Sequence, residues 1–259
     1  MKLAIFAILA GACLLGACAR QPAPVLEVVS DPAMEVSYSG EVGTGNLPQP
    51  SALPAIAEPE PGVERGTLQV NTKFFRLSAG AAEALLGQGA GTVAATSLTD
   101  AAVKTWLSAL TKRKDAEVIS SPIVQMWDGA RSNIVISNQV SYISSFELSG
   151  DGTQRIADPV VDTMTEGLML EVRATSSSDG MNLDLKLTMA ELQRPIATQN
   201  VRVFGSSMTV QTPVMFTQSL TAQGTCADGQ SLLLTGMVGQ DNEVIIVIVQ
   251  AFKVEGKGN

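Results

Sequence analysis

Few residue types in this chain could carry out catalysis. Histidine is absent from all 259 residues, which removes the most common general base, the most common metal ligand and every Ser-His or Cys-His nucleophile pair. The clustered carboxylates Asp158, Asp162 and Glu166 could contact Ca²⁺, but they lack the dense Asp/Asn/Gly spacing of a calcium-binding loop. We therefore expect no enzyme activity, no cofactor and no metal site.

Cysteine offers a different chemistry, because a thiol near the N-terminus can be acylated. Residues 1–17 contain one basic residue, Lys2, and an apolar run too short for a permanent transmembrane helix, which is typical of a signal peptide. The sequence Leu15-Gly16-Ala17-Cys18 resembles the bacterial lipobox, so we expect a lipoprotein signal peptide over 1–17 and lipidation at Cys18. By the same resemblance, Ala19 after the cysteine, rather than Asp, indicates the outer membrane. An ordinary signal peptide is the alternative.

The other two cysteines follow from that assignment. Cys13 leaves with the signal peptide, so Cys226 has no partner for a disulfide within the mature chain. We expect Cys226 to be a small buried apolar residue, and a disulfide to another molecule is the alternative.

Net charge limits the possible partners of the chain, and proline content divides the mature chain into two parts. The 17 basic and 25 acidic residues give a net charge of −8, which disfavours nucleic acid and anionic membrane surfaces as partners. Eight of the 12 prolines lie in residues 18–66, so we expect a lipidated, proline-rich tether there. Within it, Glu35–Tyr38 could add a strand to a sheet edge. Residues 67–256 are the predicted folded domain.

The periodicity of that domain predicts a mainly β protein with one packed α-helix, an α+β fold. Alternation of apolar and polar residues predicts a strand over Thr67–Leu77. Thr99 is a suitable N-cap for a helix, because apolar residues follow it with helical spacing at Val103, Trp106, Leu107 and Leu110. The run Val244–Phe252 is nearly all apolar, as in a strand that is buried on both faces.

Two β-hairpins are predicted. The first joins the alternating runs 168–174 and 181–189 through Asp179-Gly180, which we expect to form the centre of a type I′ turn and to fix the register. The second joins 214–222 to 232–234 through Asp228-Gly229.

The order of these elements resembles that of the bacterial secretin family. Ser120-Ser121-Pro122 within an apolar run, followed by a turn at Asp128-Gly129, is similar to the family's Leu-Ser-Ser-Pro strand and the strand after it. Glu166-Gly167-Leu168 and the hairpin through Asp179-Gly180 are similar to its Gly-x-x-Leu-x-Val hairpin. Asp228-Gly229-Gln230, followed by an apolar strand, is similar to its Asp-Gly-Gln segment.

This resemblance covers residues 65–254 and implies a ring in the outer membrane. Secretin subunits give strands to a shared, gated, double-walled β-barrel in type II and type III secretion, type IV pili and filamentous-phage export. The resemblance therefore implies secretin-core-like antiparallel hairpins able to join a multimeric β-barrel, a homo-oligomer, and partners from secretion or pilus machinery. Three features depart from the family pattern: the tether replaces the preceding ring-building modules, Gly239–Glu243 is short, and Gln250 stands where a proline is common.

Two functions fit these observations. The first is an outer-membrane lipoprotein that is a subunit of an oligomeric channel for protein or pilus export. The alternative is a tethered periplasmic β module that binds a secretion or pilus partner and forms no pore. The mass of the protein in detergent distinguishes them.

Overall fold

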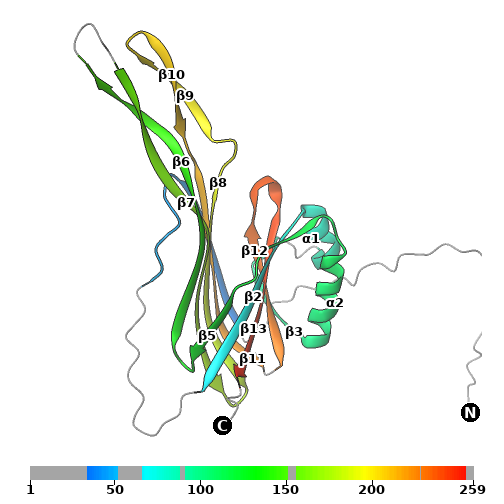
Figure 1. Ribbon diagram of the computed structural model, residues 1–259. Coiled ribbons are helices and arrows are strands. Elements are labelled where there is room, and N and C mark those ends of the chain that lie inside the picture. The colour runs from blue at the N-terminus through cyan, green and yellow to red at the C-terminus, as the bar shows by residue number, and fades with distance from the viewer. Residues whose placement is uncertain (1–33, 52–65, 88–90, 151–155, 228, 255–259) are drawn as a thin grey trace, which may run out of the picture.

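Two packed antiparallel sheets form the body of the molecule, and a long hairpin projects from one of them (Figure 1). In this computed structural model the described residues are 34–51, 66–87, 91–150, 156–227 and 229–254. Cys18 and the predicted signal peptide lie outside them. Two helices cover the face of the second sheet that points away from the first sheet (Figure 1).

The first sheet has five strands and contains the hairpin predicted around residue 180. Each strand is antiparallel to its neighbours, and the spatial order is β1 (Met34–Gly43), β11 (Met215–Ala227), β8 (Gly180–Leu192), β7 (Ile156–Ser177) and β6 (Arg131–Ser149). β1 and β6 are therefore the two edge strands of this sheet.

The second sheet has six strands and contains the C-terminal strand. The path runs through β3 (Ala94–Thr99), β12 (Gln230–Val238), β13 (Val244–Val254), β2 (Thr67–Leu77) and β4 (Ala116–Ser120), and β5 (Ile123–Trp127) also pairs with β2. A short 3₁₀ turn over Gln240–Asn242 joins β12 to β13. The predicted strand at Thr67–Leu77 is confirmed with the same bounds.

The fold class is confirmed as mainly β with packed helix, but the described residues contain two α-helices rather than one. Helix α2 (Asp100–Thr111) begins after Thr99, whose side chain accepts a 3.3 Å hydrogen bond from the Ala102 N–H, as the sequence predicts. Helix α1 (Ala79–Leu86) was not predicted. It has only eight residues, so the apolar repeat is too short to be distinctive, although Ser78 caps it by accepting from the Ala81 N–H.

β13 explains why one stretch of sequence is almost entirely apolar. Its alternate residues Ile245, Val247 and Val249 belong to the core between the two sheets. Their neighbours Ile246 and Ile248 pack under the helices. The prediction of a strand buried on both faces is confirmed.

The central hairpin has the predicted register but a different turn. Leu168 lies opposite Met189 and Leu170 opposite Leu187, so their side chains face the core together. The turn residues are Ser178 and Asp179, because Gly180 already pairs with Ser177 as the first residue of β8. Neither turn residue has the positive φ that a type I′ turn requires, so this part of the prediction is wrong.

Gly180 is nevertheless required, for a different reason. Its φ is +139°, and a Cβ at this position would lie 2.3 Å from the Cys226 carbonyl oxygen of β11. We expect Gly180→Ala to lower the free energy of unfolding by about 1–3 kcal/mol, because fraying at the strand end relieves part of the clash. Urea denaturation tests this, with Gly229→Ala as the control: φ there is +71°, and no atom lies within 4 Å of the added Cβ. Equal losses in the two variants would contradict it.

The second predicted hairpin does not form. β11 belongs to the first sheet and β12 to the second, so the chain crosses between sheets at residues 228–229. Asp228 lies outside the described residues, and Gly229 has a φ of +71°. The turn at Asp128-Gly129 also joins strands of different sheets, because β5 pairs with β2 whereas β6 pairs with β7.

Part of the segment predicted to be a tether belongs to the folded body. β1 contains the run Glu35–Tyr38 and pairs with β11 along its whole length, so the predicted edge strand is confirmed and extended. After β1 the chain crosses the outer face of the first sheet, where Leu47 is buried against Met164 and Met215. Local proline content hides this packing, since Leu47 directly precedes Pro48, and Pro50 follows two residues later.

Candidate functional site

The long hairpin formed by β6 and β7 is the most distinctive surface feature of the molecule. β6 has 19 residues and β7 has 22, so β7 extends over roughly 70 Å at about 3.3 Å per residue. β8 pairs with β7 only as far as Gly167, which lies opposite Ala190. Residues 138–149 and 156–166 therefore project beyond the body as an arm (Figure 1).

Gly167 lies where the arm leaves the body. Its φ is +143°, and a Cβ there would lie 2.2 Å from the Ile136 carbonyl oxygen and 2.8 Å from the Ser137 Cα. β6 thus passes directly against the backbone of β7 at this residue. Only glycine fits this close approach.

A second hairpin lies beside the arm (Figure 1). It consists of β9 (Ala197–Val203) and β10 (Ser206–Thr212), which pair only with each other. Val203 and Val210 of this hairpin are buried, and the Ile143 N–H of β6 donates a 2.9 Å hydrogen bond to Gln211 Oε1. The two hairpins therefore stiffen each other.

The arm exposes large apolar side chains to solvent. Val161 is 60% exposed and Leu148 is 54% exposed, and Ile156 is also exposed. In the neighbouring hairpin, Phe204 is exposed in the turn between β9 and β10. Apolar side chains exposed along a projecting element are typical of a surface that associates with protein or lipid. No described helix reaches the length and apolarity needed to cross a membrane.

A cleft of about 540 Å³, lined by both polar and apolar side chains, lies between the sheets at the base of the arm. Arg76 of β2 forms ion pairs with Glu191 of β8 and with Glu243, the latter 3.1 Å between Nε and Oε2. Burial raises the pKa of Glu191, while Arg76 acts in the opposite direction. Glu191 Oε2 is buried and has no hydrogen-bond partner among the described residues. These charges join the first sheet to the second.

A second ion pair braces the same region. Arg194 Nη1 and Nη2 donate to the two carboxylate oxygens of Glu166 at 2.9 and 2.5 Å, and the Leu192 N–H donates to Glu166 at 3.2 Å. The hydrogen bonds from Arg194, together with those from Leu192 and Asn138, lower the pKa of Glu166. Glu166 is thus a structural acceptor at the base of the arm.

The carboxylates considered as calcium ligands do not form a site in the structure. Asp158 lies opposite Glu147 on the arm, and Asp162 accepts a 3.4 Å hydrogen bond from the Tyr142 hydroxyl. Glu166 is occupied by Arg194. Within the described ranges no group of three or more acidic or cysteine side chains could hold a metal ion.

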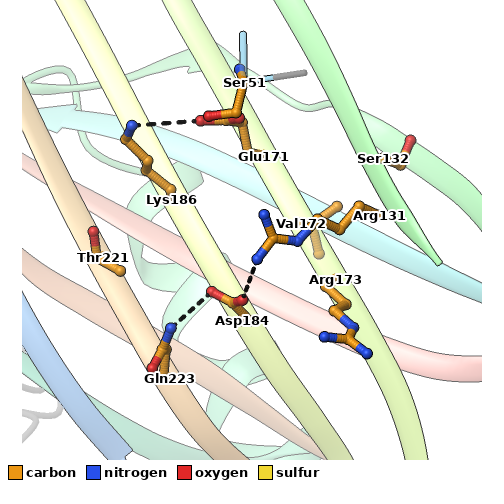
Figure 2. A pocket seen from close by; sticks show the side chains of 10 residues that line it. All are labelled: Ser51, Arg131, Ser132, Glu171, Val172, Arg173, Asp184, Lys186, Thr221 and Gln223. Carbon is orange, nitrogen blue, oxygen red and sulfur yellow. Dashed lines mark hydrogen bonds and ion pairs between the residues drawn. The ribbon is translucent and has the colours of Figure 1, made fainter. Parts of the chain in front are cut away.

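Charged and polar side chains on the outer face of the first sheet pair with one another across its strands (Figure 2). Asp184 accepts from Arg131 Nη2 at 3.2 Å and from Gln223 Nε2 at 3.1 Å, and Glu171 lies 3.6 Å from Lys186 Nζ. The Ser51 N–H also donates to Glu171 at 2.8 Å. The hollow between these groups is only about 140 Å³, so this face suits contact with water better than ligand binding.

Cys226 has the predicted environment. It is buried in the core between the sheets, and its thiol donates to the Gln230 carbonyl oxygen at 3.6 Å. The burial agrees with a small apolar residue and makes a disulfide to another molecule inaccessible in this fold.

Sequence reasoning found Gly167 as part of a motif but missed the cleft. Arg76 and Glu191 are 115 positions apart, and no local pattern links them. The one signal in the sequence is that Glu191 stands where the alternation of the preceding residues predicts an apolar side chain.

Comparisons with known proteins found one matching family and several similar solved structures. The family model described as Secretin, "Bacterial type II and III secretion system protein", matches residues 109–247. The secretin domain β-barrel of InvG from the Salmonella SPI-1 injectisome is 8% identical with a TM-score of 0.30, over 75% of this chain and 64% of that chain. The type IV competence pilus secretin PilQ of V. cholerae is 9% identical with a TM-score of 0.26, over 74% and 62%. The chain thus spans less than two thirds of either relative, and no curated protein matches.

Proposed function

Because the chain belongs to the secretin family of bacterial type II and III secretion system proteins, we propose that it is a subunit of a homo-oligomeric outer-membrane channel for protein or pilus export. Its partners are then further copies of itself and proteins of a secretion or pilus machine. The similar InvG and PilQ secretins belong to an injectisome and to a competence pilus.

The observation that carries this proposal is the arm formed by β6 and β7. Its projecting part holds at least eleven residues per strand, over 138–149 and 156–166. A barrel strand needs about 9–11 residues, tilted near 45°, to cross the apolar layer of a membrane. The exposed Val161, Leu148 and Ile156 supply apolar side chains in that part. The paired charges of the body suit the aqueous side instead.

The N-terminus supports an anchor that would hold each subunit at the membrane. Leu15-Gly16-Ala17-Cys18 resembles a lipobox, and we propose that Cys18 carries the lipid. An acyl anchor on every subunit would retain the chain at the outer membrane before the ring forms. One acyl chain alone gives only marginal membrane binding, and the two or more chains of a lipoprotein give stable attachment.

We expect Cys18→Ala to accumulate uncleaved precursor and to lose fatty-acid labelling. Cys13→Ala is the matched control, because it changes the other cysteine of the leader and should leave labelling at the wild-type level. Metabolic labelling with a radioactive fatty acid measures both. Full labelling of Cys18→Ala would show that the lipid is attached elsewhere.

The ring itself is tested by extraction of the full chain from outer membranes in mild detergent. A channel subunit gives a very large species that resists heating in detergent. A tethered module, the alternative function, gives a monomer or a small oligomer. That alternative has one observation in its favour: β1 occupies an edge of the sheet that a ring would use.

A further inference from the structure

The β1 strand covers one of the two edges through which the first sheet could extend into another molecule. It pairs with β11 from Met34–Gly224 to Gly43–Met215. Most of β1 is exposed, and Met34 is its only buried residue. Val36 packs partly against the core. β1 is therefore held mainly by main-chain hydrogen bonds, which another strand could supply equally well.

The direction of the strands decides whether β1 can stay in place in a ring. The order β1-β11-β8-β7-β6 is antiparallel at every step, so an odd number of strands makes β1 and β6 parallel. In a cyclic assembly the β6 edge of one copy meets the opposite edge of the next copy. With β1 in place every junction would be parallel. Without β1, β6 would meet β11 in the antiparallel direction.

Antiparallel junctions are the better solution for this sheet. Parallel pairing is slightly less stable per residue, and barrels in the outer membrane are built from antiparallel strands. Removal of β1 leaves four strands, β11, β8, β7 and β6, which give antiparallel pairing within and between copies. When β1 leaves, β11 loses its main-chain hydrogen bonds with β1. Hydrogen bonds with β6 of the next copy replace them.

The outer edge of β6 has the properties of an edge that pairs with a strand of another molecule. No described strand pairs with that edge. Val135 is 41% exposed and Ile136 is 43% exposed, and as neighbours in a strand they point to opposite faces. An apolar edge strand left uncovered in this way promotes pairing with another chain. β6 has 19 residues, enough to cover the ten residues of β11 that β1 now occupies.

We propose that the β11 edge is the docking surface for β6 of a second copy, and that β1 is a removable strand that blocks this surface until assembly. The inference rests on the proposed ring. The segment after β1 can stay in place, because Leu47 is buried and its N–H donates to the Thr165 carbonyl oxygen at 2.8 Å. Asn46 Oδ1 also accepts from the Thr165 N–H at 2.7 Å.

A disulfide between β1 and β11 tests the proposal in the full-length chain. Ser37 lies opposite Thr221, and both are accessible on the outer face. Paired Cα atoms of antiparallel strands are about 4.5–5.5 Å apart, within the range of disulfides. The clamp is Ser37→Cys with Thr221→Cys. The matched control clamps β8 to β11, which stay paired in either case, by Asn182→Cys with Thr225→Cys. All variants carry Cys226→Ala, so that the introduced thiols have no competitor in the fold.

The oxidised β1–β11 clamp should lower the yield of the high-mass species at least tenfold, and growth with a thiol reductant should restore it. The control clamp should assemble like the parent. A full yield of the high-mass species with the oxidised β1–β11 clamp would overturn the proposal and make β1 a fifth strand of the ring, with the proposed function intact. No high-mass species from the unclamped parent would overturn both the ring and this inference.

Discussion

Gly167→Ala is expected to lower the free energy of unfolding by about 2–5 kcal/mol and to abolish the high-mass species. The added Cβ would lie 2.2 Å from the Ile136 carbonyl oxygen, a backbone atom that cannot rotate away. A φ of +143° adds strain for any residue with a side chain. Unlike Gly180, Gly167 lies in mid-strand, paired with Ser137 on one side and Ala190 on the other, so fraying cannot relieve the clash.

The matched control is Gly205→Ala, which separates the cost of φ from the cost of the clash. Gly205 also has positive φ, +86°, but no atom lies within 4 Å of the added Cβ. We expect it to cost about 1 kcal/mol and to leave assembly unchanged. Urea denaturation of the detergent-solubilised protein measures the free energies of unfolding, and gel filtration measures the amount of the high-mass species. If both variants assemble normally, the arm does not depend on close contact at Gly167.

The elements that the sequence predicted correctly are those whose local pattern and tertiary role agree. Leu183, Leu185 and Leu187 alternate with polar residues because one face of β8 packs on the second sheet while the other carries paired charges. β13 lacks alternation because it is covered on both faces. Thr99 predicts the start of α2 because its hydroxyl accepts a hydrogen bond from the Ala102 N–H, which has no backbone partner in the first turn of the helix.

The elements that were missed depend on contacts between distant parts of the chain. β11 and β12 are two apolar runs joined by an Asp-Gly turn, a pattern identical to that of a hairpin. Only tertiary packing assigns them to different sheets, because β12 is needed between β3 and β13 under the helices. β1 was partly obscured by the prolines around it, and its pairing with β11 joins residues almost two hundred positions apart.

The cleft charges are the clearest case of a site that no sequence pattern contains. Arg76 comes from β2, Glu191 from β8 and Glu243 from the turn just before β13, and they meet only because the two sheets pack together. Their ion pairs lie close to Gly167 and Arg194, at the base of the arm. These ion pairs therefore join the two sheets at the point where the arm begins.

Arg76→Ala is expected to lower the free energy of unfolding at neutral pH by about 2–4 kcal/mol, less than for a fully buried pair because the Arg76 side chain is 28% exposed. The substitution leaves Glu191 and Glu243 facing each other without a cation. The double variant Arg76→Ala with Glu191→Gln should recover most of the loss, since it removes the uncompensated charge. No recovery would mean that the arginine acts through packing of its alkyl chain.

The pH dependence of the free energy of unfolding gives an independent test of the buried charge on Glu191. Burial already raises the pKa of Glu191, and loss of Arg76, which opposes that effect, raises it further. The folded state then binds a proton more readily than the unfolded state, so stability falls as pH rises from the ordinary carboxyl pKa through the raised one. The loss caused by Arg76→Ala should therefore be small at about pH 4 and complete at about pH 7.5. The lowered pKa of Glu166 changes stability in the opposite direction, but it acts in both proteins and cancels in the difference. A loss that is constant across this range would exclude Glu191 as its source.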